Sequence, residues 1–339
     1  MYILAKCPRI AWLSTLPLVL AFAATPMMVL AQQASEESVQ LDTLSLDCSA
    51  LETLDTPVSG VEWMRRSLLA QHCVNFQARA VRAGSGGVRT LALTHEVDDG
   101  TERDELVMLD DSPLTHERRG VTAMLLKNEH GLFAATPDAI VDHLDDYYRF
   151  RLFDNQRIAG RPAVRVDVEP RDNFRHARRQ WIDVETALPL KQELLGERGV
   201  LETFQLVELD VGQRYAGTIA VESTVSKLEG PWQPDWLPPG FIRQSVKQDA
   251  SRQGRVHHLY SDGLATLSLF VEPLQGQPSL KPGIHRLGAS QAAVVQPRIG
   301  EQFYQIMAMG ELPPYVLRRV VSSMEASLSR SSPASQPAS

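Results

Sequence analysis

Short catalytic and metal-binding motifs are missing from this 339-residue sequence. It contains no HExxH, CxxC or GxSxG, which argues against a zincin-type zinc site, a dithiol redox site and a nucleophile elbow. The run at Gly84–Gly87 lacks the spacing of a dinucleotide-binding loop and fits a hairpin turn. We therefore predict a binding protein and not an enzyme, with no cofactor and no metal ion.

Positive charge and aromatic residues are also scarce. Lys and Arg number 34 against 41 Asp and Glu, for a net charge of −7, which argues against general nucleic-acid binding. Aromatic residues make up 6% of the chain, so its cores must consist mainly of Leu, Val and Ala. The length and the 43% of apolar residues are enough for two domains with separate cores.

A long apolar run occurs only near the N-terminus. Two basic residues precede an apolar stretch over residues 10–24, and residues 29–31 offer small side chains suited to cleavage. The sequence thus predicts a cleavable signal peptide over residues 1–31 and a soluble, exported protein. An uncleaved membrane anchor is the alternative, and Pro17 and Pro26 disfavour it.

Two cysteines, Cys48 and Cys73, remain once the signal peptide is removed. Export places them in an oxidising compartment, where such a pair is commonly joined. We expect a disulfide between them, with two free thiols as the alternative.

Hydrophobic periodicity divides the chain into different segments. A capping box at Ser59 predicts a helix over residues 60–72, and Thr136 followed by proline predicts a second. Elsewhere the period changes to two, which is typical of antiparallel strands with one face exposed to solvent. The expected order is a signal peptide at 1–31, a flexible N-terminal segment at 32–57, a large domain at 58–211, a linker at 212–230, a small C-terminal domain at 231–326 and a disordered tail at 327–339.

Four arginines lie close together in an otherwise acidic protein: Arg171, Arg175, Arg178 and Arg179. A solvated strand-and-loop face is one interpretation. The other is a site whose guanidinium groups bind phosphates or the carboxylates of a partner.

The residue types of a hydrolase triad occur at His257, Ser261 and Asp262. Their spacing fits a strand, a turn at Asp262-Gly263 and a second strand better than a catalytic site. An exported hydrolase is therefore kept only as a third hypothesis.

Several motifs, in order along the chain, resemble the RseB/MucB family of envelope-stress regulators. In the expected large domain they are RIAGRPA at 157–163, PRD at 170–172 and LPLK at 188–191. In the expected small domain they are WLPPGF at 236–241, HLYSDGLA at 258–265, FVEP at 270–273 and GELP at 310–313. The chain departs from the family pattern at residues 75–80, at His176 and at Ala187, which concerns the first strand and the details of a ligand pocket.

The resemblance implies an α+β fold with a large domain like the lipoprotein carriers LolA and LolB, an unclosed antiparallel β-barrel with helices in its concavity, and a smaller C-terminal α/β domain. It also implies a periplasmic negative regulator of the sigma-E or AlgU type of sigma factor. Such a protein binds the periplasmic region of a membrane-spanning anti-sigma factor of the RseA/MucA type. It shields this partner from regulated proteolysis and is released by lipopolysaccharide or mislocalised lipoprotein. A periplasmic lipid or lipoprotein carrier without a regulatory role is the alternative, and a homo-oligomer is left open.

On this basis three sets of residues become candidate sites. Acyl chains in the barrel would contact Leu91, Leu93, Leu106, Met108, Met124 and Leu126, unless these residues form a packed core without a cavity. The four arginines would bind anions or the partner. A seam between the domains would accept a partner peptide at Trp236, Tyr260, Ser261, Asp262 and Gly263.

Overall fold

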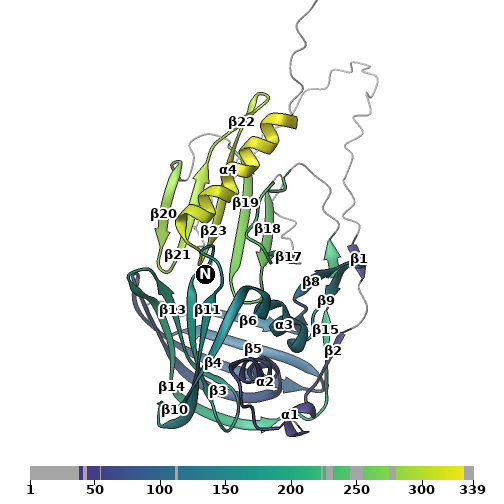
Figure 1. Cartoon of the computed structure of the whole chain (residues 1–339), viewed down its shortest axis with the longest axis vertical. Coiled ribbons are helices and arrows are strands. Elements are labelled where there is room, and N and C mark those ends of the chain that lie inside the picture. The colour runs from purple at the N-terminus through teal and green to yellow at the C-terminus, as the bar shows by residue number, and fades with distance from the viewer. Residues whose placement is uncertain are drawn as a thin grey trace, which may run out of the picture. The chain divides into compact units, whose positions relative to one another are not determined.

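The computed structural model describes residues 38–40, 44–53, 55–110, 114–222, 224–226, 232–244, 255–274 and 280–331. They belong to one compact unit, Glu36–Ser339, whose largest sheets have nine and seven strands (Figure 1). The predicted signal peptide over 1–31 lies outside the described residues. No helix within the described ranges is long and apolar enough to span a membrane.

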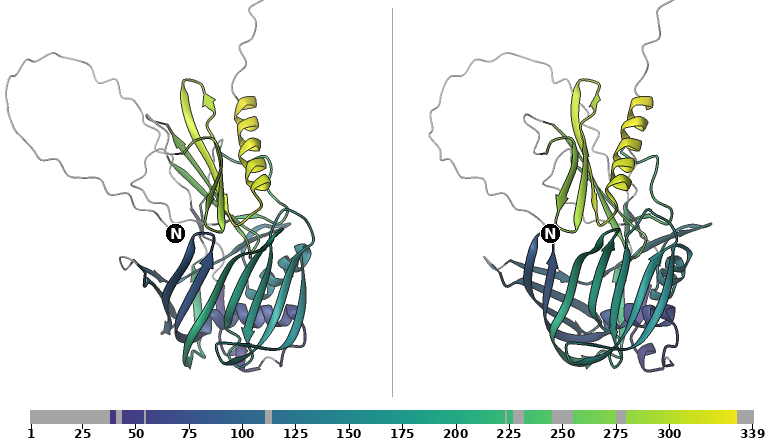
Figure 2. Two further views of the ribbon diagram at one scale, coloured as in Figure 1. Left: turned by 90° about the vertical axis from the view of Figure 1, so that its left-hand side faces the viewer. Right: turned by 60° about the vertical axis from the view of Figure 1, so that its left-hand side comes forward.

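The nine-stranded sheet is antiparallel throughout and does not close on itself. Its strands, in spatial order, are β10 (Tyr148–Ile158), β11 (Arg161–Pro170), β12 (Ala177–Asp183), β13 (Pro189–Gly196), β14 (Gly199–Arg214), β3 (Val74–Gly84), β4 (Gly87–Asp98), β5 (Thr101–Met108) and β6 (Thr115–Arg119). The two end strands, β10 and β6, do not pair with each other, and the sheet curves around helix α2 (Gly60–Cys73) (Figures 1 and 2). The predicted unclosed antiparallel barrel is thus confirmed.

Both helices predicted for the large domain are present, and local capping explains where they begin. The Ser59 side chain accepts from the Glu62 amide, while the Glu62 carboxylate accepts from the Ser59 amide, so α2 starts with a complete capping box. Helix α3 (Pro137–Tyr147) starts with Thr136 as its N-cap and proline in its first turn. Their apolar sides share one core with the sheet, which includes Trp63, Met64, Val141, Leu144, Val164, Val166 and Val168.

The segments expected to be a flexible lead-in and a linker contain regular structure, which corrects those predictions. Strand β15 (Thr218–Glu222) pairs with β2 (Leu44–Asp47) and with β7 (Val121–Thr122), and β16 (Thr224–Ser226) pairs with β1 (Ser38–Gln40). Helix α1 (Ala50–Thr53) follows β2, while β8 (Leu125–Asn128) and β9 (Gly131–Ala134) form a hairpin. Alternate side chains of β15 are buried beside β2, a long-range pairing that sequence composition does not reveal.

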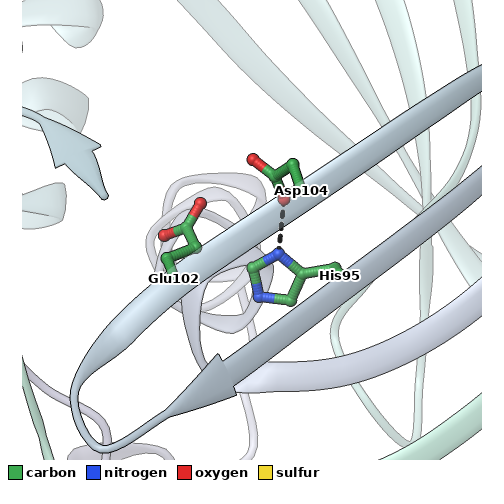
Figure 3. A group of neighbouring side chains, drawn as sticks. All are labelled: His95, Glu102 and Asp104. Carbon is green, nitrogen blue, oxygen red and sulfur yellow. Dashed lines mark hydrogen bonds and ion pairs between the residues drawn. The ribbon is translucent and has the colours of Figure 1, made fainter. Parts of the chain in front are cut away.

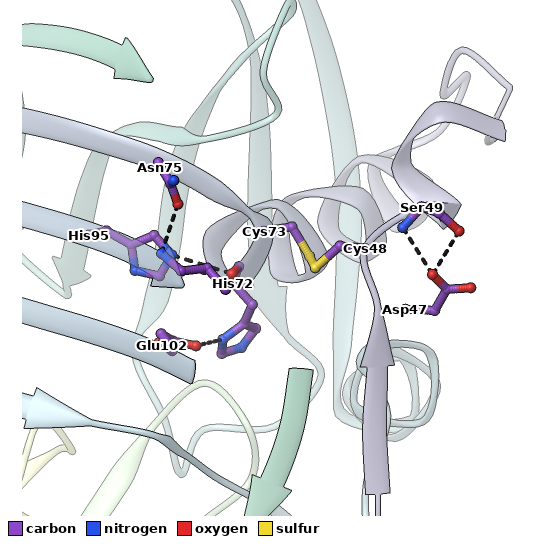
Figure 4. Close-up of a disulfide and its surroundings, with 9 residues drawn as sticks. Asp47, Cys48, Ser49, His72, Cys73, Asn75, His95 and Glu102 are labelled. Atoms are coloured by element: carbon purple, nitrogen blue, oxygen red, sulfur yellow. Dashed lines mark hydrogen bonds and ion pairs between the residues drawn. A yellow bond between two sulfur atoms is a disulfide. The ribbon is translucent and has the colours of Figure 1, made fainter. Parts of the chain in front are cut away.

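The predicted disulfide between Cys48 and Cys73 is present and fully buried. It links the turn after β2 to the last residue of α2 (Figure 4). The N-terminal segment is therefore attached covalently to the helix in the concavity of the large sheet.

The second sheet is also antiparallel and carries one helix. Its strands, in order, are β17 (Ile242–Gln244), β18 (Val256–Ser261), β19 (Thr266–Pro273), β23 (Gln302–Gly310), β21 (Ser290–Val295) and β20 (Gly283–Leu287), with β22 (Arg298–Ile299) paired to β23. Helix α4 (Pro314–Ser331) lies along this sheet and buries Val316, Leu317, Val320, Val321 and Met324 (Figure 2). The helix continues to residue 331, so it includes the first part of the tail predicted to be disordered over 327–339.

His258 on β18 should make the protein sensitive to acid. Its side chain is only 3% exposed, and burial, followed by the charge of Arg243, lowers its pKa to about 4. Between pH 6.5 and 4 the unfolded state binds the proton more readily, so folding free energy is lost as the pH falls through that window. Urea unfolding at pH 7 and pH 4.5 should show wild type losing about 2 kcal/mol more than the variant His258→Leu. Equal losses in the two proteins would contradict this assignment.

Candidate functional site

A buried ion pair joins the large sheet to a turn of the second sheet. The turn at Ser261–Ala265 follows β18, and its Asp262 has no solvent-exposed surface. Asp262 Oδ1 accepts from the turn's own amides, at 2.9 Å from Leu264 N and 2.7 Å from Ala265 N. Its Oδ2 accepts from Arg175 Nη1 at 2.6 Å and from the Tyr148 hydroxyl at 2.8 Å. The turn is therefore bound to two residues of the large domain.

The guanidinium of Arg175 is enclosed on every side. Its Nη2 donates to the carbonyl oxygen of Pro239 at 2.6 Å and lies 3.0 Å from Asp172 Oδ2. Burial alone would lower the pKa of Arg175, but the carboxylates of Asp262 and Asp172 raise it. Burial and the charge of Asp262 raise the pKa of the Tyr148 hydroxyl, so this group stays protonated as a donor.

Other contacts cross the same seam between the sheets. Arg178 Nη2 lies 2.8 Å from Glu311 Oε2, and the His143 ring meets the Gly240 carbonyl oxygen at 2.9 Å. Gly240 has a φ of +83°, and a Cβ there would lie 2.5 Å from the Tyr147 ring, so a larger residue would push the seam apart. The rings of Trp236 and Phe174 pack edge to face, with their centroids 5.4 Å apart.

The structure separates the four predicted arginines. Arg175 and Arg178 are used in the seam, whereas Arg171 donates to the backbone carbonyls of Asp145 and Tyr148 at the end of α3. Arg179 lies on β12 beside Asp167 and Glu193. Arg175 can reach an external anion only if the seam opens. A role of the arginines in binding a partner remains a prediction.

Of the predicted seam residues, Trp236, Asp262 and Gly263 lie where the two sheets meet. Asp262 contacts the large domain directly, and a Cβ on Gly263 would touch Ile140 and Met124. Tyr260 and Ser261 are buried, with Tyr260 in the core of the second sheet. Their part in binding a peptide is untested. Sequence reasoning missed Tyr148, because nothing in its local pattern indicates a partner in the turn of another sheet, and it missed the local pair of Asp172 with Arg175.

The triad required by the hydrolase hypothesis is not assembled. The His257 ring stacks on Phe270 and meets Ser268 Oγ at 3.2 Å. Ser261 Oγ donates to the carbonyl oxygen of Ala265, and Asp262 is bound to Arg175. The three side chains have separate partners, so the order strand, turn, strand explains their spacing.

A groove of about 1360 Å³ runs beside the seam, lined from both sheets. One wall comes from the β3–β4 and β13–β14 turns, and the other from the β20–β21 turn and the start of α4. Ser85 Oγ donates to the carbonyl oxygen of Gly288 across it, at 2.9 Å. Three exposed arginines, Arg198, Arg286 and Arg318, line the groove together with the carboxylates of Glu197 and Glu202. The three guanidinium groups could bind acidic side chains of an extended polypeptide.

The residues predicted to line a lipid cavity do not form one set. Leu91 lies opposite Met108, and Leu93 opposite Leu106, on one face of β4 and β5. Met124 instead lies beside the Gly263 turn, and Leu126 is buried on β8. These long-range placements depend on how the β8–β9 hairpin packs, and periodicity does not report that.

A smaller cavity of about 380 Å³ opens between α2 and the large sheet. Its apolar lining includes Leu68, Phe76, Leu93, Leu188, Phe204 and Leu206, so Leu93 is the member of the predicted set that lines it. A polar cluster that includes His95, Glu102 and Asp104 completes its wall (Figure 3). This cluster was also missed, although the Asp99-Gly100 turn that fixes its register is visible in the sequence.

Two family models match the chain. The model described as the MucB/RseB N-terminal domain matches residues 59–239, and the model described as the MucB/RseB C-terminal domain matches residues 226–325. Together they span both large sheets.

Curated and solved proteins of the same kind are similar to the chain. The sigma factor AlgU regulatory protein MucB of Pseudomonas aeruginosa is 31% identical over 78% of this chain and 90% of its own length. The sigma-E factor regulatory protein RseB of Escherichia coli K12 is 26% identical over 80% of this chain and 91% of its own. The crystal structure of MucB in complex with MucA(peri) matches with a TM-score of 0.60 and 29% identity, covering 78% of this chain and 97% of that one.

Proposed function

The chain belongs to the MucB/RseB family, and from this premise we propose that it is a sigma factor regulatory protein that binds the periplasmic domain of a MucA-type anti-sigma factor. The observation that carries the proposal is the likeness, over both domains, to MucB bound to MucA(peri). The side chains of His257, Ser261 and Asp262 each have other partners within the protein, which agrees with a binding role rather than with hydrolysis.

The finer parts of the proposal concern location and regulation. The protein acts in the periplasm after removal of residues 1–31, and a buried disulfide is in keeping with an oxidising compartment. Bound to the anti-sigma factor, it shields that partner from regulated proteolysis. Lipopolysaccharide or mislocalised lipoprotein releases it, and an open sheet with a partly apolar cavity supports this part.

The groove beside the seam is the region we propose for the partner. An extended segment lying there would contact both sheets at once, and Arg198, Arg286 and Arg318 would attract its acidic residues. A lipid ligand can weaken partner binding only if its affinity differs between the partner-bound and the partner-free form of the protein. The seam between the two sheets is a place where these two forms can differ in structure.

Titration calorimetry of the purified protein with the periplasmic domain of the MucA-type protein from the same organism tests the proposal. We expect a one-to-one complex of micromolar affinity or tighter, weakened when lipopolysaccharide is added. Arg318→Glu should weaken binding about tenfold, since it reverses a charge in the groove, whereas Arg151→Glu on the outer edge strand β10 should not. Absence of a complex would overturn the regulator and favour the carrier.

A further inference from the structure

A row of polar side chains crosses the large sheet on the face that lines the smaller cavity. In the strand register, His95 on β4 lies opposite Asp104 on β5, and Asp104 lies opposite Arg118 on β6. Opposite residues of antiparallel strands share a face, so the three side chains meet there. Glu102, two residues before Asp104, joins them. His95, Glu102 and Asp104 each offer one ligand atom, and these atoms lie within 4.8 Å of one another (Figure 3).

Both ring nitrogens of His95 face atoms that accept hydrogen bonds. Nε2 lies 3.3 Å from the backbone carbonyl oxygen of His72, which can only accept (Figure 4). Nδ1 lies 2.7 Å from Asp104 Oδ1, a shorter contact in which the ring donates to a carboxylate. A metal ion bound to Nδ1 would take the place of the proton between these two atoms, while Nε2 would donate to the His72 carbonyl oxygen.

The surroundings of the cluster are those of a metal site. Histidine ligands commonly donate their second ring nitrogen to a backbone carbonyl, which fixes the ring in place. Glu102 is also fixed by a neighbouring side chain, because its Oε2 lies 2.8 Å from His72 Nδ1 at the end of α2. Glu102 is only 2% exposed, and a carboxylate buried to that extent requires a positive partner.

Arg118 supplies positive charge in this structure and hydrogen-bonds both carboxylates, but about half of its side chain is exposed. Its Nη2 lies 2.6 Å from Glu102 Oε1 and its Nε lies 2.8 Å from Asp104 Oδ2. Its side chain is 48% exposed on β6, whose residues are all exposed, so it can turn away into solvent. Two carboxylates and one guanidinium leave one negative charge when both histidines are neutral. A divalent ion in place of the guanidinium would neutralise both carboxylates.

We propose that His95, Glu102 and Asp104 form a binding site for a divalent transition metal ion such as Zn²⁺. His72 positions Glu102, and Arg118 is the counter-ion that the metal displaces. One imidazole nitrogen and two carboxylates suit Zn²⁺ better than Ca²⁺, which prefers six or more oxygens. Ligand atoms about 2.0 Å from a tetrahedral ion lie about 3.3 Å apart, so the pair now at 2.7 Å must separate slightly by side-chain rotation. The cavity gives the ion a route in and leaves its fourth position accessible to water.

Titration calorimetry of the purified, chelator-treated protein with ZnCl₂ tests the site. We expect one Zn²⁺ per chain with a dissociation constant in the micromolar range or tighter, and a rise in Tm on binding. His95→Gln and Asp104→Asn should each weaken binding by at least about tenfold. His116→Gln is the matched control. His116 is an exposed histidine on β6, the edge strand that carries Arg118, and it lies opposite Leu106, outside the cluster. No binding, or equal weakening by the control, would overturn the site.

Arg118→Gln separates a metal site from a purely structural ion-pair network. If the metal displaces the guanidinium, removing that competing charge should tighten Zn²⁺ binding about tenfold. If the cluster is only a salt-bridge network, the variant loses stability and its affinity for Zn²⁺ does not change, which would overturn the proposal. This test does not depend on whether the ligand variants fold.

Discussion

Replacing Arg175 by methionine should lower the free energy of unfolding by about 3–4 kcal/mol, among the largest effects expected of any single change in this protein. The substitution leaves the Asp262 carboxylate fully buried without its cationic partner. Tyr148 still donates one hydrogen bond, but a neutral donor does not offset the lost charge. Urea unfolding at pH 7, followed by tryptophan fluorescence and by circular dichroism, measures the change.

A matched control is the exposed ion pair between Arg151 and Glu169 on the outer strands of the large sheet. Arg151→Met should change the free energy of unfolding by less than about 1 kcal/mol, because water screens an exposed pair. Combining Arg175→Met with Asp262→Asn should cost less than the sum of the two single changes, since the second removes the charge that the first leaves unpaired. A loss below 1 kcal/mol for Arg175→Met alone would mean that the pair does not hold the seam.

Removing the disulfide by replacing Cys48 and Cys73 with serine should lower the free energy of unfolding by about 3 kcal/mol. The bond closes a loop with a sequence separation of 25, and its loss frees that loop in the unfolded chain. Both sulfur atoms are fully buried, so serine hydroxyls at these positions add a cost of desolvation. Urea unfolding of the double variant, compared with the oxidised wild type, gives the difference.

Dithiothreitol provides the internal control for this prediction. It should lower the stability of the wild type by a similar amount and leave the double variant unchanged. If the double variant is as stable as the oxidised wild type, the attachment of the N-terminal strand to α2 contributes nothing to folding.

Local signals in the sequence predicted the elements whose determinants lie within a few residues. The capping residues of α2 and α3 act over three or four positions, and the buried stripe of α4 repeats at helical intervals. The predicted removal of residues 1–31 leaves two cysteines, which allow one pairing within the chain, so the sequence also predicted the disulfide. The motifs that resemble the RseB/MucB family lie within the residues that the two family models match.

The sequence did not predict which of the candidate site residues lie together, because their grouping depends on contacts between residues far apart in the chain. The lipid-lining set assumed that apolar residues in successive strands share one face, and the structure divides it between β4–β5 and β8. The cluster at His95 and Asp104 required following the Asp99-Gly100 hairpin outward by four residues, and reaching Arg118 required the next strand pairing as well. The N-terminal strands were mistaken for a flexible segment because β15 and β16, with which they pair, follow them by more than 170 residues.

By itself, then, the sequence determined where the helices begin, which cysteines are joined, and to which family the chain belongs, because caps, hydrophobic periods and ordered motifs are read within short stretches. Only the tertiary structure decided that Arg175 is bound to Asp262, 87 residues away, instead of facing solvent, and that His95, Glu102 and Asp104 face one another. A charged side chain can satisfy its charge with water or with a buried partner, and the choice between them depends on strand register and on how the sheets pack.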